Sequence, residues 1–352
     1  MKLPEKEFNI YAEERPKVLL LGNGLCRAYG GMPWDMLLDE IKDSSAFPQA
    51  ASSYIMPMPL KAAMLANNTL SDKLRKIVAE GNASEIQQST TNWGSFVKTT
   101  EQMREHIKKL VGCDFDYVLT TNYSYEIEAA LLGKEKLSPQ GIAQLMNFCE
   151  VDNAQTQFLI NTFNLVNNIP VWHIHGEARK PDSMILGHYY YGKLLRRCVA
   201  RLDGTNERTE RKKLVAPGKE KEYVKNLKAK RSQKIGSWID AFVLGDVHIL
   251  GFGMDFSEAD LWWLIEYKSN HPEFRGRTIF YEPEKAKTST CVLDGQGTCD
   301  KSAAYTLSAQ CKHLLMNRTY GVEIKTLGMT IQSDSDFEEF YIRAIDDISK
   351  AR

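Results

Sequence analysis

The sequence lacks the features of a membrane, secreted or zinc-ribbon protein. No apolar run reaches the roughly 18 residues of an ordinary transmembrane helix. The opening residues, MKLPEKEFNIYAEERPK, are polar and acidic, unlike a signal peptide. The seven cysteines include no CxxC pair, which favours free thiols in a reducing cytosol. We therefore expect a cytoplasmic protein with no membrane partner.

The chain also lacks an excess of charge of one sign. Lys+Arg and Asp+Glu number 45 each, so no overall field attracts the protein to nucleic acid. The most basic stretch, 203–234, holds 11 Lys/Arg against 5 Asp/Glu. Aromatic residues do not alternate with its basic ones, as stacking platforms for bases would require. We expect a solvated polar insertion there and no nucleic-acid partner.

Four short apolar runs carry the main structural signal. They are VLLLGNG (18–24), YVLTTN (117–122), VWHIHG (171–176) and VHILGFG (247–253). Such charge-free runs are typical of strands buried on both faces of a parallel sheet. Helical patterns follow several of them, and residues 277–282 and 322–328 are predicted to be later strands. The alternation predicts an α/β fold with a doubly wound, mostly parallel sheet.

The predicted organisation is one domain over residues 1–352 with insertions into a sheet-forming core. Residues 44–112 and 138–168 are predicted to be helical insertions that form a subdomain beside the sheet, and residues 203–234 a basic polar insertion. The predicted core consists of residues 17–43, 113–132, 169–195 and 235–330.

Each of the four runs ends in small or polar residues, and ligands bind such sheets outside the carboxyl ends of the strands. The turn at LLLGNG could let backbone approach a phosphate, or it could be a plain tight turn. A conventional NAD dehydrogenase would have an acidic residue about 20 residues on, in a strand context. Asp39 and Glu40 lie in a helical pattern instead, which argues against that class.

Two further endings each allow two interpretations. Asn122 could bind a ribose hydroxyl or a water, or it could be a satisfied turn residue. In GFGMDFSEAD, Asp255 or Ser257 could cap a helix, and the turn could also form a second wall for a ribose or adenine.

The pair in VWHIHG could bind a metal, but the sequence offers no obvious third and fourth ligand. We therefore expect no metal site. His173 lies within the apolar run, which favours a buried, hydrogen-bonded structural role. His175 lies at the mouth beside Gly176, and the ordinary pKa of a histidine suits a general base near neutral pH.

Together these motifs resemble the bacterial SIR2-like family, relatives of sirtuins that include defence-associated NAD hydrolases. LLLGNG resembles the family's phosphate turn, and GMPW (31–34) its following G-x-P segment. TTNY, WHIHG and LGFGMDFSEADLWWLI resemble the later motifs, in the expected order between residues 17 and 282. The same residues are also similar to the abortive-infection AbiH group.

The resemblance implies a Rossmann-like sheet and an NAD⁺ site. Asn122 and His175 would be catalytic, Asn122 orienting the nicotinamide ribose together with Thr121, and His175 acting as base. The pyrophosphate would lie against the first turn and the adenosine against the second. The residues assigned to binding are Gly22, Asn23, Gly24, Pro33, Thr121, Gly251, Gly253, Met254 and Asp255.

The expected activity is hydrolysis of NAD⁺ to nicotinamide and ADP-ribose by an antiphage effector. NAD⁺ is then a substrate, and no cofactor or zinc is expected. The sirtuin zinc module is absent, which disfavours a protein deacylase or ADP-ribosyltransferase. Ser124 stands where many relatives carry Asp, which favours the alternative of a non-catalytic sensor of NAD or ADP-ribose. Homo-oligomerisation or an activating protein is expected to trigger the enzyme.

Overall fold

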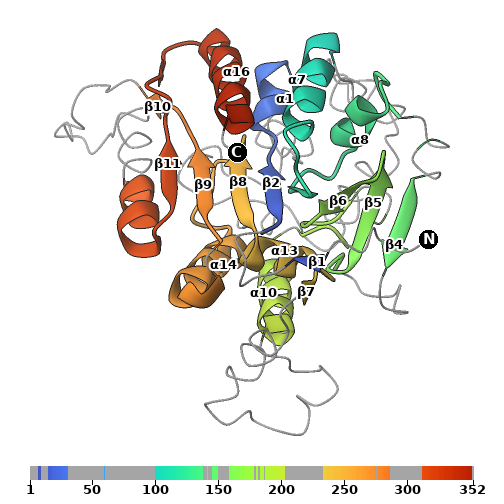
Figure 1. The fold of residues 1–352 in the computed structure, drawn as a ribbon, viewed down its shortest axis with the longest axis vertical. Coiled ribbons are helices and arrows are strands. Elements are labelled where there is room, and N and C mark those ends of the chain that lie inside the picture. The colour runs from blue at the N-terminus through green and yellow to red at the C-terminus, as the bar shows by residue number, and fades with distance from the viewer. Residues whose placement is uncertain are drawn as a thin grey trace, which may run out of the picture.

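An eight-stranded, mostly parallel sheet forms the centre of the computed structural model (Figure 1). Its order is β11-β9-β8-β2-β3-β6-β5-β4. The parallel strands are β2 (Lys17–Leu21), β3 (Tyr117–Thr120), β6 (Ile169–His173), β8 (Asp246–Leu250), β9 (Thr278–Tyr281) and β11 (Glu323–Lys325). β5 (Thr162–Val166) and β4 (Met146–Cys149) extend one edge in antiparallel pairing. The structure describes residues 7–8, 15–30, 59, 100–137, 141, 145–149, 158–177, 180, 183–185, 187–202, 233–274, 276–285 and 311–350.

Strand β2 occupies the point where the order of the sheet reverses. Numbered along the chain, the six parallel strands follow the order 3-2-1-4-5-6. The chain adds β3 and β6 on one side of β2, and later β8, β9 and β11 on the other. The register aligns Leu21 with Thr120 and with Leu250, and Thr120 with His173. Four predicted strands therefore end level at one edge, where ligands of such sheets bind.

Helices cover both faces of the sheet because successive strand residues point to opposite sides. In β2, Val18 and Leu20 join one apolar core, whereas Leu19 and Leu21 join the other. The first core includes α10 (His188–Leu202), α13 (Trp238–Leu244) and α14 (Ala259–Asn270). The second includes α1 (Gly24–Ala28), α7 (Glu101–Val111), α8 (Glu126–Leu131) and α16 (Asp334–Lys350). Figure 1 shows these two groups of helices on opposite sides of the sheet.

The prediction of charge-free strands buried on both faces is confirmed for all four runs. The later strands at 277–282 and 322–328 are also confirmed. The prediction that 138–168 is helical was wrong for residues 146–149 and 162–166, which are β4 and β5. The reason is tertiary: β5 pairs with β6, and β4 then pairs with β5.

The remaining predicted insertions lie mainly outside the described residues. In 44–112 the structure describes residue 59 and the segment from residue 100, where α7 begins after a Thr100 side chain that accepts a hydrogen bond from the Met103 amide. Residues 203–232 lie outside the described part. The minor elements are β1 (Glu7–Phe8) paired with β7 (Gln233–Lys234), β10 (Glu284–Lys285) paired with β12 (Thr330–Ile331), η2 (Pro272–Phe274) and η3 (Leu315–Thr319). Among the described helices, none has the length and apolar character needed to cross a bilayer.

Candidate active site

The two Gly-rich turns lie side by side beyond the ends of β2 and β8. The Gly22 amide donates to the Leu250 carbonyl at 3.0 Å, and the Gly24 amide donates to the Gly251 carbonyl at 2.6 Å. A Cβ atom on Gly22 would lie 2.5 Å from the Gly251 oxygen. A Cβ atom on Gly24 would lie 2.5 Å from the Tyr341 hydroxyl. Close packing of the turns therefore requires these glycines, whether or not a phosphate also binds there.

Asn122 is fixed at three of its polar atoms. Its amide N donates to Thr120 Oγ1 at 3.1 Å, and its carbonyl lies 2.6 Å from His173 Nδ1. Its side-chain Nδ2 lies 3.8 Å from Cys26 Sγ. The fourth atom, Oδ1, is buried and has no hydrogen-bond partner within the described structure. An oriented amide with one buried acceptor to spare calls for a donor from a ligand, because an unpaired buried acceptor costs about 1–3 kcal/mol.

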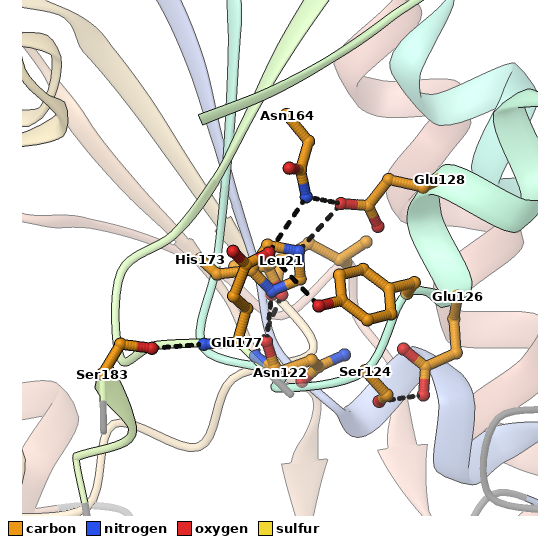
Figure 2. A network of polar contacts seen from close by, with 11 residues as sticks. Leu21, Asn122, Ser124, Glu126, Glu128, Asn164, His173, Glu177 and Ser183 are labelled. Carbon is orange, nitrogen blue, oxygen red and sulfur yellow. Dashed lines mark hydrogen bonds and ion pairs between the residues drawn. The ribbon is translucent and has the colours of Figure 1, made fainter. Parts of the chain in front are cut away.

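A buried ion pair of His173 and Glu128 contacts the backbone carbonyl of Asn122 (Figure 2). His173 Nε2 lies 2.8 Å from Glu128 Oε1, and both side chains are inaccessible to solvent. Burial alone disfavours the imidazolium, but Glu128 outweighs it and raises the pKa of His173 to about 9. At neutral pH both ring nitrogens of His173 therefore donate, one of them to the Asn122 carbonyl. The predicted structural role of His173 is confirmed.

A second buried carboxyl lies next to Asn122, beside Ser124. The Ser124 hydroxyl donates to Glu126 Oε1, and Glu126 Oε2 has no partner in the described parts of the chain. Burial raises the pKa of Glu126 to about 7. The carboxyl is close enough to Cys26 to help raise the pKa of that buried thiol. Although position 124 is a serine, the Glu126 side chain places a carboxyl group beside it.

His175 turns toward the opposite face of the sheet from His173. Strand β6 ends at His173, so the alternation that would place both rings on one side stops there. His175 Nε2 lies 3.1 Å from Asp260 Oδ2, and its Nδ1 lies 3.9 Å from Glu258 Oε2. The Tyr191 hydroxyl donates to the same Glu258 oxygen at 2.8 Å. We call His175, Tyr191, Glu258 and Asp260 the imidazole cluster.

His175, predicted at the mouth of the site beside Gly176, is buried in the structure. The residue is only 3% exposed, since α10 and α14 pack around its ring. Its pKa is not ordinary either. Burial lowers it, but Asp260 and then Glu258 outweigh burial, so the pKa of His175 lies above the usual value for histidine. A base at this position has to lose a proton that two carboxylates help to hold.

Three members of the imidazole cluster could also hold a metal ion. One ligand atom each from His175, Glu258 and Asp260 lie within 4.8 Å of one another. The two carboxylates, however, face different nitrogens of the ring, and an imidazole binds an ion through one nitrogen. One ion could not replace both contacts without moving Glu258 or the ring. The arrangement as it stands matches an imidazolium that hydrogen-bonds to Asp260 and has Glu258 as a second, more distant ionic partner.

The second Gly-rich turn is held in a strained conformation. Met254 is fully buried and has a φ of +46°, a left-handed conformation that is uncommon for residues other than glycine. The carbonyl of Gly253 accepts a hydrogen bond from Lys312 Nζ at 2.6 Å. Strain of this kind persists only where the surroundings enforce it.

Asp255 forms a local turn ahead of α14. Its Oδ1 accepts from the Ser257 amide at 2.9 Å and from the Ser257 hydroxyl at 2.6 Å. The residue at the N-cap of α14 is Glu258, and its side chain makes no cap hydrogen bond. The predicted alternative in which Asp255 or Ser257 caps the following helix is therefore wrong for α14.

The predicted site residues fall into two neighbouring clusters. Asn122 contacts Cys26 and His173, whereas His175 contacts the other members of the imidazole cluster. The clusters adjoin where Tyr123 approaches Tyr191: burial and Glu258 raise the pKa of Tyr191, and Tyr123 adds to the shift. Thr121 is half-buried, Asn23 begins α1 without a side-chain cap bond, and Pro33 lies outside the described residues.

Four acidic residues were not recognised from the sequence as partners of the site: Glu126, Glu128, Glu258 and Asp260. Each begins or belongs to a helix that packs on the sheet. The available signal was the spacing of acidic residues, E-x-E in YEIEAALL and E-x-D in SEADLWW, within otherwise apolar helices. Charged residues at buried positions need partners, so this spacing indicates that partners exist without identifying them.

Comparison with known proteins adds no relative: no family model matches the chain, and no curated protein does.

Proposed function

We propose that the protein is an NAD⁺ glycohydrolase, which forms nicotinamide and ADP-ribose, and that it acts as a cytoplasmic antiphage effector. The observation that carries the proposal is Asn122: two contacts hold its backbone, its side-chain Nδ2 lies 3.8 Å from Cys26 Sγ, and its buried Oδ1 has no partner among the described residues. A hydroxyl of the nicotinamide ribose would supply the missing donor.

The sheet supports a nucleotide ligand independently of the motifs. Its six parallel strands follow the order 3-2-1-4-5-6, and open parallel sheets bind ligands where the strand order reverses. Here the reversal lies between β2 and β8, the strands that carry the two Gly-rich turns. We propose that the first turn faces the pyrophosphate and the second the adenosine.

The proposed chemistry requires few residues. The pyridinium leaves as neutral nicotinamide, so the departing group needs no general acid. By analogy with glycoside cleavage, the ribose passes through an oxocarbenium-like transition state. Asn122 would orient the ribose, and neutral His175 would remove a proton from the attacking water. Because the pKa of His175 is raised, activity should increase as the pH rises through that pKa.

The same raised pKa favours one alternative function. A His175 that is protonated at neutral pH cannot accept a proton, so a protein in that state would bind NAD⁺ or ADP-ribose without cleaving it. The second candidate is therefore a sensor module that reports on NAD through a partner. An activating protein or self-association that withdraws Glu258 or Asp260 from His175 would convert this state into an enzyme.

The test is nicotinamide release from NAD⁺ by the purified full-length chain between pH 6 and 9. We expect release by the wild type and a fall of about 100-fold or more for Asn122→Ala and His175→Ala. Asn270→Ala and His188→Ala remove exposed residues of the same types and should leave the rate unchanged. Binding of NAD⁺ with no release at any pH would favour the sensor. Neither binding nor release would contradict both candidates.

A further inference from the structure

We infer that Glu258 is the residue through which His175 exchanges its proton with solvent. The inference gives the proposed hydrolase a proton exit, and it rests on the proposed function only for that purpose. The contacts of His175 are present in the protein without a ligand, so the exchange can be measured on the protein alone.

The side chains of His175 and its two acidic partners, Glu258 and Asp260, differ in their access to water. The exposed fraction of the side chain is 0% for Asp260, 4% for His175 and 16% for Glu258. The ring of His175 therefore reaches solvent less readily than the Glu258 carboxylate beside it. A path from the His175 ring through Glu258 to water therefore leads from a more buried group to a less buried one.

The two ring nitrogens of His175 have different contacts: Nε2 makes a hydrogen bond, and Nδ1 makes a longer ionic contact. Asp260 lies 3.1 Å from Nε2, which fixes the ring and keeps a proton on that nitrogen. Glu258 lies 3.9 Å from Nδ1, a distance that a small rotation of the carboxylate can reduce to that of a hydrogen bond. Nδ1 is thus the nitrogen that can gain and lose a proton while the ring stays in place.

Among the described residues near the ring and Asp260, Glu258 is the suitable acceptor. Burial raises the pKa of Tyr191 and of the Cys198 thiol near Asp260, so both stay protonated at neutral pH. Burial and the neighbouring Asp260 raise the pKa of Glu258 to about 7, although His175 opposes the shift. A carboxyl with that pKa can both accept and release a proton near neutrality, as a relay must.

The proposed reaction also requires an exit for one proton. Hydrolysis converts NAD⁺ and water into nicotinamide, ADP-ribose and H⁺. Water supplies the hydroxyl that bonds to the ribose carbon, the pyridine nitrogen keeps the electron pair of the broken bond, and the proton passes to His175 Nδ1. From there it moves to Glu258 and then to solvent, which restores neutral His175 for the next turnover.

The experiment follows the proton on Nδ1 of His175 by NMR in the full-length protein labelled with ¹⁵N-histidine, without NAD⁺. The His175 signal is assigned as the one absent from His175→Gln. We expect its exchange with water to be at least tenfold slower in Glu258→Gln. Glu266→Gln, which alters an exposed glutamate on the same helix, should exchange at the wild-type rate.

A second variant separates proton transfer from structural support. In Glu258→Ala, formate added to the solution should restore fast exchange, because it supplies a carboxylate without restoring the side chain. Wild-type exchange in a folded Glu258→Gln protein, or slow exchange in Glu258→Ala that formate does not accelerate, would overturn the inference. Absence of nicotinamide release would count against the hydrolase alone, since exchange is measured without substrate.

Discussion

At the scale of single residues, His173 and His175 differ through their partners and not through their sequence context. Both follow apolar residues in VWHIHG, yet one meets Glu128 on one face and the other meets Asp260 on the opposite face. The sequence predicts that one ring is structural, because His173 lies inside the run. It cannot predict the partners, since the carboxylates come from helices 45 and 85 residues away along the chain.

Loss of the Glu128 charge should destabilise the protein in a pH-dependent way. At pH 6 Glu128→Gln leaves the His173 imidazolium buried without its carboxylate, and we expect a loss of about 3–5 kcal/mol of unfolding free energy. The pKa of His173 is raised from 6.5 to about 9 in the folded state, so the stabilisation is present below pH 6.5 and is lost as the pH rises through 9. Urea unfolding at pH 6 and 9.5 measures the difference.

The control for this variant is Glu266→Gln, which should change the unfolding free energy little at either pH. If Glu128→Gln cost the same at pH 6 and at pH 9.5, His173 would not be the charged partner, and its support of the Asn122 carbonyl would need another explanation.

At the scale of elements, the strands that flank the site were predictable because each is a charge-free run that has to be buried on both faces. Strands β4 and β5 were not, because their apolar residues also fit helical spacing. In TFNLV (162–166) four of the five residues are buried, so no clear alternation identifies a strand. Residues 162–166 form a strand because they pair with β6, and the local sequence does not determine such long-range pairing.

The two Gly-rich turns give a prediction at this scale. Gly22→Ala places a methyl group 2.5 Å from the Gly251 oxygen, and we expect a loss of about 1–3 kcal/mol from overpacking. Gly192→Ala is the matched control, because its Cβ meets no atom within 4 Å in the middle of α10. That change should stabilise the protein by about 0.5–1 kcal/mol. Thermal unfolding of both variants measures the contrast, and a harmless Gly22→Ala would contradict the interlocking of the turns.

At the scale of the whole molecule, the buried carboxyls link folding to pH. Burial raises the pKa of Glu126 from 4.5 to about 7. The stability associated with its neutral form is present below pH 4.5 and is lost as the pH rises through 7. Glutamine imitates the neutral carboxyl, so Glu126→Gln should match the wild type at pH 5 and exceed it by on the order of 2 kcal/mol at pH 8.

Chemical unfolding of the two proteins across this range measures the effect on the whole fold. The control Glu266→Gln changes an exposed residue, and its unfolding free energy should follow that of the wild type at every pH. A Glu126→Gln protein that lost stability at pH 8 would mean that the carboxylate has a partner when ionised.

The strand order also determines when a functional site can exist during synthesis. Strand β2 leaves the ribosome early, but the turn after it packs against Gly251, and His175 depends on Glu258 and Asp260. A nascent chain that ends before β8 has neither the second turn nor the carboxylates of the imidazole cluster. A ribosome that stalls in the middle of the message therefore releases a fragment without a complete site. If the proposed function holds, such a fragment would lack the groups needed to consume the NAD of the cell that makes it.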